Sequence, residues 1–182
     1  MGDIIFLHGA SSSGKSTLAR ALQASIPFPF WHISINHLRD SGVLPLARVQ
    51  SGDFDWKAMR ASFFDGYHRS LGAYADAGNN LIIEHILDTP GWQGQLARSF
   101  LPHRVLFVAL HAPLGVLNVR EAARGDRPEG SAEKDFNTIH QGRQYDLEIS
   151  SADPLEANVT AVVSAWEIQQ GRSAFFDLVK GL

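Results

Sequence analysis

Short apolar segments alternate along the chain with longer segments in which apolar residues recur at helical spacing. The apolar segments are rich in β-branched and aromatic residues and show little polar alternation, a pattern typical of strands buried on both faces of a sheet. Strands are predicted at residues 3–8, 31–35, 81–84, 104–110 and 145–149. Their alternation with helices favours an α/β fold, with a five-stranded, mostly parallel sheet between two layers of helices.

The helical segments carry recognisable start and stop signals. Helices are predicted at residues 15–25, 55–77, 113–123 and from 153 towards 170. The first is closed by Pro27 and Pro29, and the second ends at Gly78. Pro113 suits the first turn of the third helix, and Asp153 followed by Pro154 suits the start of the last. Residues 38–54 show no clear periodicity.

Composition narrows the class of protein. A chain of 182 residues, 45% hydrophobic and 19% charged, fits one globular domain, which we place at residues 1–182. The net charge of −3 gives no general attraction to nucleic acid or to an anionic membrane. The absence of cysteine excludes disulfides, thiolate metal sites and cysteine nucleophiles. With no targeting segment or membrane-length apolar stretch, we expect a cytoplasmic protein, of an oligomeric state that the sequence does not reveal.

One motif carries specific chemistry. Residues 9–16 match the phosphate-binding pattern G-x-x-x-x-G-K-[ST], between a predicted strand and a predicted helix, as its mechanism requires. A Gly/Ser-rich turn is the chance alternative. The candidate nucleotide-binding residues are Gly9, Ala10, Ser11, Ser12, Ser13, Gly14, Lys15, Ser16 and Thr17. In this pattern the lysine binds the β- and γ-phosphates and the hydroxyl of Ser16 binds Mg²⁺, so the expected ligands are ATP and Mg²⁺.

An acidic residue ends the third predicted strand. Glu84 follows three apolar residues, and a carboxylate at this place in a phosphate-binding fold can hold Mg²⁺ directly or through water. Glu84 could equally cap a loop or pair with an arginine. His37 and His85 adjoin candidate site positions, but the eight histidines show no metal-ligand spacing.

Three arginines are clustered at the end of the third predicted helix and just beyond it. Arg120 and Arg124 are four residues apart and share a helix face, whereas Arg127 follows the bend that Gly125 allows. Arginines on a closing segment stabilise the charge of a phosphoryl group during its transfer. The alternative is a solvated helix end, where basic residues suit the helix dipole. We favour a lid, at about residues 124–142.

Four stretches together resemble the chloramphenicol phosphotransferase-like family of small-molecule kinases. They are residues 8–16 (HGASSSGKS), 120–127 (REAARGDR), 140–148 (HQGRQYDLE) and 164–168 (SAWEI). The resemblance implies a nucleoside-monophosphate-kinase-like core with a lid. It also implies ATP-dependent phosphorylation of a hydroxyl on a small molecule, which in the namesake activity is a primary hydroxyl of chloramphenicol. By position, Lys15 and Ser16 would hold phosphates and Mg²⁺, and Arg120, Arg124 and Arg127 would belong to the lid.

The chain departs from the family pattern after the second predicted strand. The family has an aspartate there that accepts the proton of the acceptor hydroxyl, whereas this chain has Asn36 followed by His37. Asparagine can position a hydroxyl but cannot act as a base near neutral pH. His37 or Asp40 could substitute, or the acceptor could need no base, as for a phosphate. Glu84 and His85 also stand where the family tends to carry aspartates.

Three functions are therefore weighed. The first is a small-molecule kinase with a hydroxyl acceptor held by about residues 36–78. The second is a kinase acting on a nucleotide or another phosphorylated acceptor, and the third is a regulator that binds nucleotide without catalysis. The intact lysine and serine of the phosphate motif and the three arginines favour retained phosphoryl chemistry.

Overall fold

The computed structural model describes residues 1–124 and 130–177. Five parallel strands form one sheet in the order β2-β3-β1-β4-β5. The strands are β1 (Asp3–His8), β2 (Phe30–Ser34), β3 (Asn80–His85), β4 (Arg104–His111) and β5 (Leu147–Ser150). The helices are α1 (Lys15–Ser25), α2 (Ile35–Asp40), α3 (Leu46–Gln50), α4 (Trp56–Asp76), α5 (Trp92–Phe100), α6 (Leu114–Arg124), α7 (Ser131–Thr138) and α8 (Leu155–Ile168), followed by the 3₁₀ turn η1 (Ala174–Phe176).

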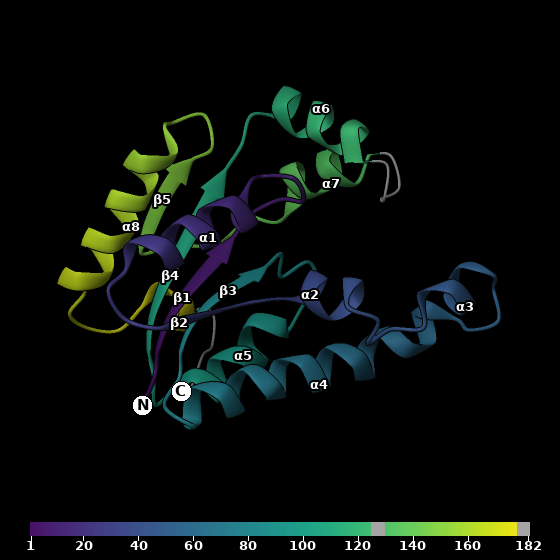
Figure 1. Cartoon of the computed structure of the whole chain (residues 1–182), viewed down its shortest axis with the longest axis horizontal. Helices are drawn as coiled ribbons and strands as arrows, with labels where there is room; N and C mark the ends of the chain where they lie inside the picture. Colours follow the sequence, from purple (N-terminus) through teal and green to yellow (C-terminus); the bar gives the residue numbers. More distant parts are fainter. Residues whose placement is uncertain (125–129, 178–182) are drawn as a thin grey trace.

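The sheet is covered on both faces. Side chains of β1 alternate between two cores because successive strand residues point to opposite faces. Ile4 and Phe6 pack with α4, α5 and η1, whereas Ile5 and Leu7 pack with α1 and α8. Figure 1 shows these two helical layers on either side of the sheet. The three-layer α/β prediction is confirmed.

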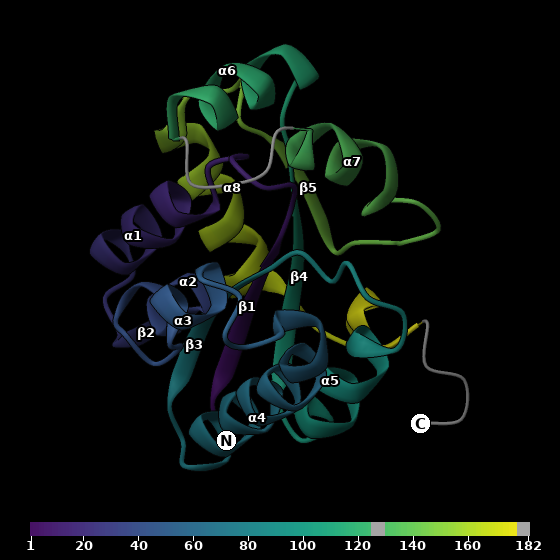
Figure 2. The same ribbon diagram turned by 90° about the vertical axis from the view of Figure 1, so that its right-hand side faces the viewer.

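The central position of β1 determines where the phosphate motif lies. Because β1 lies between β3 and β4, its carboxyl end opens at the middle of the sheet edge, where ligands bind in open α/β folds. Figure 2 shows α6 and α7 beyond the carboxyl ends of β1 and β4. A small third core joins them to the motif through Ala10, Leu117, Ala132 and Ile139.

Several strand boundaries differ from the sequence prediction by one or two residues, and two of these differences have a local reason. Ile35 begins α2 instead of ending β2, because Ser34 Oγ accepts a hydrogen bond from Asn36 N at 3.2 Å and caps the helix. β5 begins at Leu147 and not at Tyr145, because the carboxylate of Asp146 accepts from Phe107 N at 2.7 Å.

Four of the helices were not predicted from the sequence. Helices α2 and α3 are short and contribute no fully buried residue, so periodicity does not reveal them. Helix α7 spans one polar stretch with a single buried residue, Ala132. Helix α5 buries Leu96, Ala97 and Phe100 but follows a loop without a capping side chain. Among the described residues, no helix is long and apolar enough to cross a membrane.

Candidate functional site

Residues 9–16, which we call the phosphate loop, wrap tightly around the end of β1. A side chain at Gly9 would place its Cβ 2.6 Å from the carbonyl oxygen of Leu110 and 2.9 Å from Ser13 Oγ. Gly14 caps α1 with φ of 103°, a conformation that favours glycine. The two glycines of the motif are therefore required by close approach and by backbone geometry.

The donors of the loop suit an anion. Lys15 is buried, and its Nζ donates to the carbonyl oxygens of Gly9 and Ala10, each at 2.7 Å. The buried hydroxyls of Ser11 and Ser12 have no hydrogen-bond partner within the described part of the chain. Unpartnered buried hydroxyls beside a lysine and a helix N-terminus fit the oxygens of a phosphate group.

A carboxylate faces the loop from the neighbouring strand. Ser16 Oγ donates to Glu84 Oε2 at 2.9 Å, and His32 on β2 contacts Glu84 Oε1. Burial alone would raise the pKa of Glu84, but the hydrogen bond from His32, the charge of Lys15 and the hydrogen bond from Ser16 outweigh it and lower the pKa. Glu84 is thus held ionised, as an oxygen ligand for a divalent cation must be.

The structure brings one of the three predicted arginines to the loop. Arg120 Nη1 donates to the carbonyl oxygens of Ser12 and Ser13 at 3.3 and 3.4 Å. Arg124 is the last residue of α6, with its side chain outside the description, and Arg127 lies outside the described residues. The carboxylate of Glu121 accepts from Gly130 N and Ala132 N, which fixes α7 against α6.

Helix α7 adds a carboxylate to the loop. Asp135 Oδ2 accepts a hydrogen bond from Ser11 N at 2.9 Å. Backbone N–H groups of such loops are the donors that bind phosphate oxygens. Asp135 therefore occupies a donor that a nucleotide phosphate would use.

Asn36 and His37 lie in different surroundings. Asn36, in the first turn of α2, lines the main cavity. His37 is exposed, and its ring packs 4.6 Å from that of His32. Partial loss of solvent around the ring, followed by the charge of His32, lowers the pKa of His37. Neither His37 nor Asp40 is among the described residues that line the cavity.

One cavity of about 1160 Å³ connects the loop with a second, largely apolar region. Its phosphate end includes Lys15, Ser16, Glu84 and Arg120. The opposite region, which we call the acceptor wall, comprises Leu44, Leu46, Val49, Trp56, Phe63, Phe64 and Trp92. Ligand pockets are usually apolar with a few placed polar groups, and here Arg60 and Asp88 are such groups.

Sequence reasoning missed several of these residues. His32 lies in a predicted strand and Asp135 in a polar segment, and neither belongs to a motif. Arg60 is one of several charged residues on the long helix α4. Contacts across the fold identify them, and we find no sequence signal that could have done so.

A protein of Mycobacterium tuberculosis, present in two strains under the provisional name O-phosphotransferase, is 29% identical over 169 residues. The alignment covers 82% of this chain and 75% of that protein.

Solved kinases share the fold. The APS kinase of Mycobacterium tuberculosis, in complex with AMPPNP and APS, superimposes with a TM-score of 0.68 at 16% identity. The match covers 91% of this chain and 98% of that kinase. Shikimate kinase from Aquifex aeolicus has a TM-score of 0.61 at 18% identity, with 90% and 96% covered.

A family model adds the assignment. The model described as chloramphenicol phosphotransferase-like protein matches residues 2–169, nearly the whole chain. The sequence resemblance is thereby confirmed. The chain belongs to the chloramphenicol phosphotransferase-like family and is a kinase.

Proposed function

We propose that this kinase transfers the γ-phosphoryl group of ATP to a hydroxyl group of a small molecule. The observation that carries the proposal is that the phosphate loop and the acceptor wall line the same cavity. A phosphoryl group held at Lys15 would face whatever molecule lies against the acceptor wall. Phosphoryl transfer depends mainly on such positioning and on stabilisation of charge.

Each group at the loop has a role in this reaction. Mg²⁺, when bound with ATP, neutralises charge on the phosphates. Ser16 and Glu84 would hold the cation, and the described residues contain no group of three or more His, Asp or Glu side chains that could hold it alone. The phosphates of the nucleotide would therefore complete its oxygen ligands. Lys15 and Arg120 would stabilise charge on the transferred group.

The lid and the acceptor region remain parts of the proposal. Residues 124–142 would close over the phosphates and bring Arg124 and Arg127 towards the phosphate loop, which Arg120 contacts. Residues 36–78 would hold the acceptor, since α2, α3 and α4 line the cavity. Asn36 would position the acceptor hydroxyl. His37 does not line the cavity, so it would affect the site only through its ring contact with His32. A cytoplasmic location, where ATP is plentiful, completes the proposal.

Asn36 favours a second candidate. An acceptor that is already anionic needs no base, so a phosphorylated acceptor would explain why no carboxylate stands at this position. The acceptor wall is apolar, which does not favour a charged acceptor. Arg60 and Asp88 place one positive and one negative charge beside it.

The experiment is an ATP-turnover assay with the purified protein and a panel of alcohols, chloramphenicol, sugars, nucleosides and nucleotides. Lys15→Ala should lower kcat/KM at least about a hundredfold, the usual cost of removing a group that stabilises transition-state charge. Arg98→Ala, which removes an exposed positive charge outside the cavity and outside residues 36–78, is the matched control. Unchanged turnover in Lys15→Ala would overturn the role of the loop. ATP binding without turnover of any acceptor would favour the non-catalytic regulator.

A further inference from the structure

The segment after β3 forms a turn with an uncommon backbone conformation. Leu87 has φ of 52°, in the left-handed region that side-chain-bearing residues rarely adopt. Leu87 is also buried, in the core that α4 and α5 share. Residues keep such conformations where the surrounding structure over-determines them, and they gather at functional sites.

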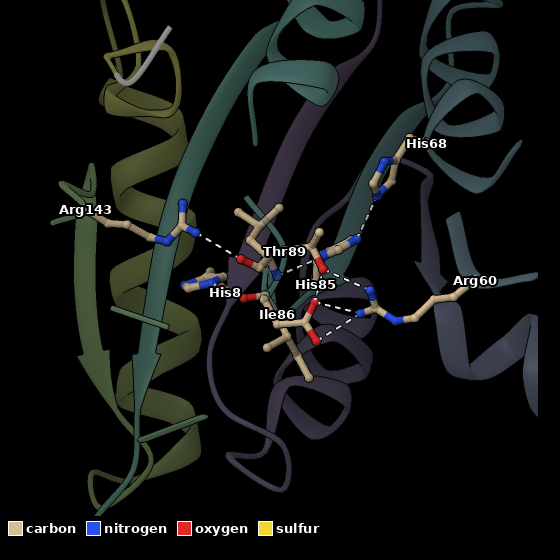
Figure 3. A network of polar contacts seen from close by, with 9 residues as sticks. His8, Arg60, His68, His85, Ile86, Thr89 and Arg143 are labelled. Carbon is tan, nitrogen blue, oxygen red and sulfur yellow. Dashed lines mark hydrogen bonds and ion pairs between the residues drawn. The ribbon is translucent and has the colours of Figure 1, made fainter. Parts of the chain in front are cut away.

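Three side chains hold the backbone of this turn, residues 86–89. His8, at the end of β1, donates from Nε2 to the carbonyl oxygen of Ile86. Leu87 N donates to His85 Nδ1 at 2.9 Å, and Arg143 Nη2 donates to the carbonyl oxygen of Leu87 at 2.9 Å. Figure 3 shows His8 and Arg143 on one side of the turn and His85 on the other. Strands β1 and β3 and the segment after α7 thus converge on one turn.

A second layer of contacts orients one of these histidines. Because Leu87 N donates to His85 Nδ1, the proton of neutral His85 is on Nε2, which lies 3.0 Å from His68 Nε2. His68 Nδ1 then donates to Gln95 Oε1 at 2.9 Å. Burial is the main cause that lowers the pKa of His85 well below its usual value, so the ring is neutral.

The other histidine is oriented by the stretch at residues 140–148. Tyr145 OH lies 2.9 Å from His8 Nδ1 and 2.8 Å from His140 Nδ1. This stretch is one of the four that carry the resemblance to the family, and the proposed phosphoryl transfer gives it no role. Its residues Tyr145 and Arg143 both act on the turn.

The turn carries a charged pair into the cavity. Arg60 Nη2 donates to both carboxylate oxygens of Asp88, at 2.8 and 3.0 Å, and Arg60 Nη1 donates to Thr89 Oγ1 at 2.9 Å. The guanidinium carbon of Arg60 lies 4.5 Å from the ring centre of Trp92 and 4.9 Å from that of Phe64. Arg60 and Asp88 both line the cavity, next to the acceptor wall.

The pairing determines which ligands suit this end of the cavity. Asp88 neutralises Arg60 and repels a second anion, so a phosphorylated molecule gains little here. A hydroxyl or amide can still bond to the carboxylate lone pairs and to the remaining guanidinium N–H groups. The aromatic side chains around Arg60 suit an apolar body on the same molecule.

We propose that the Arg60–Asp88 pair determines acceptor specificity, selecting uncharged hydroxyl- or amide-bearing molecules against phosphorylated ones, and that Arg143 is a positioning residue that holds the pair through the turn. The inference rests on the proposed function and decides between its two candidate acceptor classes. It assigns the stretch at residues 140–148 to the acceptor side of the cavity.

The test measures binding, so that it does not depend on turnover. Calorimetry with AMPPNP present would compare chloramphenicol, and two matched pairs: uridine with uridine monophosphate, and glucose with its phosphate ester. The wild-type protein should bind at least one uncharged probe. Where uridine or glucose binds, its affinity should be at least about tenfold higher than that of its phosphorylated counterpart. In Asp88→Asn the uncharged probes should bind about tenfold more weakly and the phosphorylated ones more tightly, because Arg60 loses its counter-charge.

Two further variants separate positioning from folding. Arg143→Gln should weaken the uncharged probes severalfold and leave AMPPNP affinity unchanged, and Arg143→Lys should restore part of the loss. Glu167→Gln, exposed on α8 and outside the cavity, is the control. If no uncharged probe binds, if the phosphorylated members bind more tightly, or if Asp88→Asn leaves the preference unchanged, the inference is overturned. Selective binding without phosphorylation would instead overturn the proposed function and leave the inference standing.

Discussion

Ser16, in the first turn of α1, donates a 2.9 Å hydrogen bond to Glu84, the penultimate residue of β3. Strands β1 and β3 are parallel neighbours in which Leu7 pairs with Glu84, so the register of the sheet places the carboxylate beside the phosphate loop. The loop and the acidic strand end therefore form one site, although 68 positions separate the two residues.

Glu84→Gln should weaken Mg²⁺ binding in the presence of AMPPNP by about tenfold to a hundredfold, because the amide cannot replace the charge of the carboxylate. Calorimetric titration with Mg²⁺ measures the change directly. EDTA should abolish ATP turnover in the wild-type protein. An unaltered Mg²⁺ affinity in Glu84→Gln, with Glu167→Gln as the control, would remove Glu84 from the proposed cation site.

Asp135→Ala should strengthen ATP binding about threefold to tenfold. The variant frees Ser11 N for a phosphate oxygen and removes a negative charge from the loop. Calorimetry with AMPPNP is the measurement, and Glu133→Ala, an exposed acidic residue on the same helix, is the control. A weaker affinity in Asp135→Ala would show that Asp135 supports the nucleotide site and does not compete for it.

Stability should fall as the pH drops below about 6.5, the ordinary pKa of histidine. Burial lowers the pKa of His8 and of His85 well below that value, so both stay neutral in the folded protein. The unfolded chain binds more protons in this window, and each such histidine lowers the free energy of unfolding by up to about 1.4 kcal/mol per pH unit. Denaturant titrations at several pH values give the free energy of unfolding, and its slope against pH should be shallower in His85→Gln than in the wild-type protein. Equal slopes would contradict the neutral assignment.

Asn36→Asp tests whether the natural acceptor needs a base. If positioning dominates, the variant should gain no more than about tenfold in kcat on a hydroxyl acceptor. A gain of about a hundredfold or more, typical of general-base catalysis, would mean that the wild-type protein lacks a base its hydroxyl acceptors need. Asn36→Ala, measured beside it, should raise the acceptor KM because it removes the positioning amide.

The chemistry of the phosphate end was accessible from sequence because it is local. The loop needs glycines, a lysine and a hydroxyl at consecutive positions, so a short pattern contains most of the site. Gly9 and Gly14 show why, since one faces a backbone oxygen too closely for a side chain and the other has positive φ. Strands β1, β3 and β4 were found for a similar reason, because each contains a continuous apolar run.

The acceptor side was not accessible because its residues are brought together only by packing. Arg60 and Asp88 are 28 positions apart, and the turn that contains Asp88 is held by His8 and Arg143, which lie far apart in the sequence. Arg60 and Asp88 have no local pattern that distinguishes them from ordinary surface residues, and the stretches that contain His8 and Arg143 do not reveal that these two side chains meet at this turn. The short helices α2 and α3 were not predicted, because neither has a fully buried residue that would give an apolar pattern.

The sequence by itself determined the α/β class, the family and the phosphate-binding end of the site, because these depend on periodicity and on residues adjacent in the chain. Only the tertiary structure decided what faces that end. Parallel strands bring their carboxyl ends to one edge, where Glu84 meets Ser16, and α4 and α7 add Arg60 and Asp135 from opposite sides. Contacts between distant segments depend on strand order and packing angles, and those follow from the whole chain and not from any one motif.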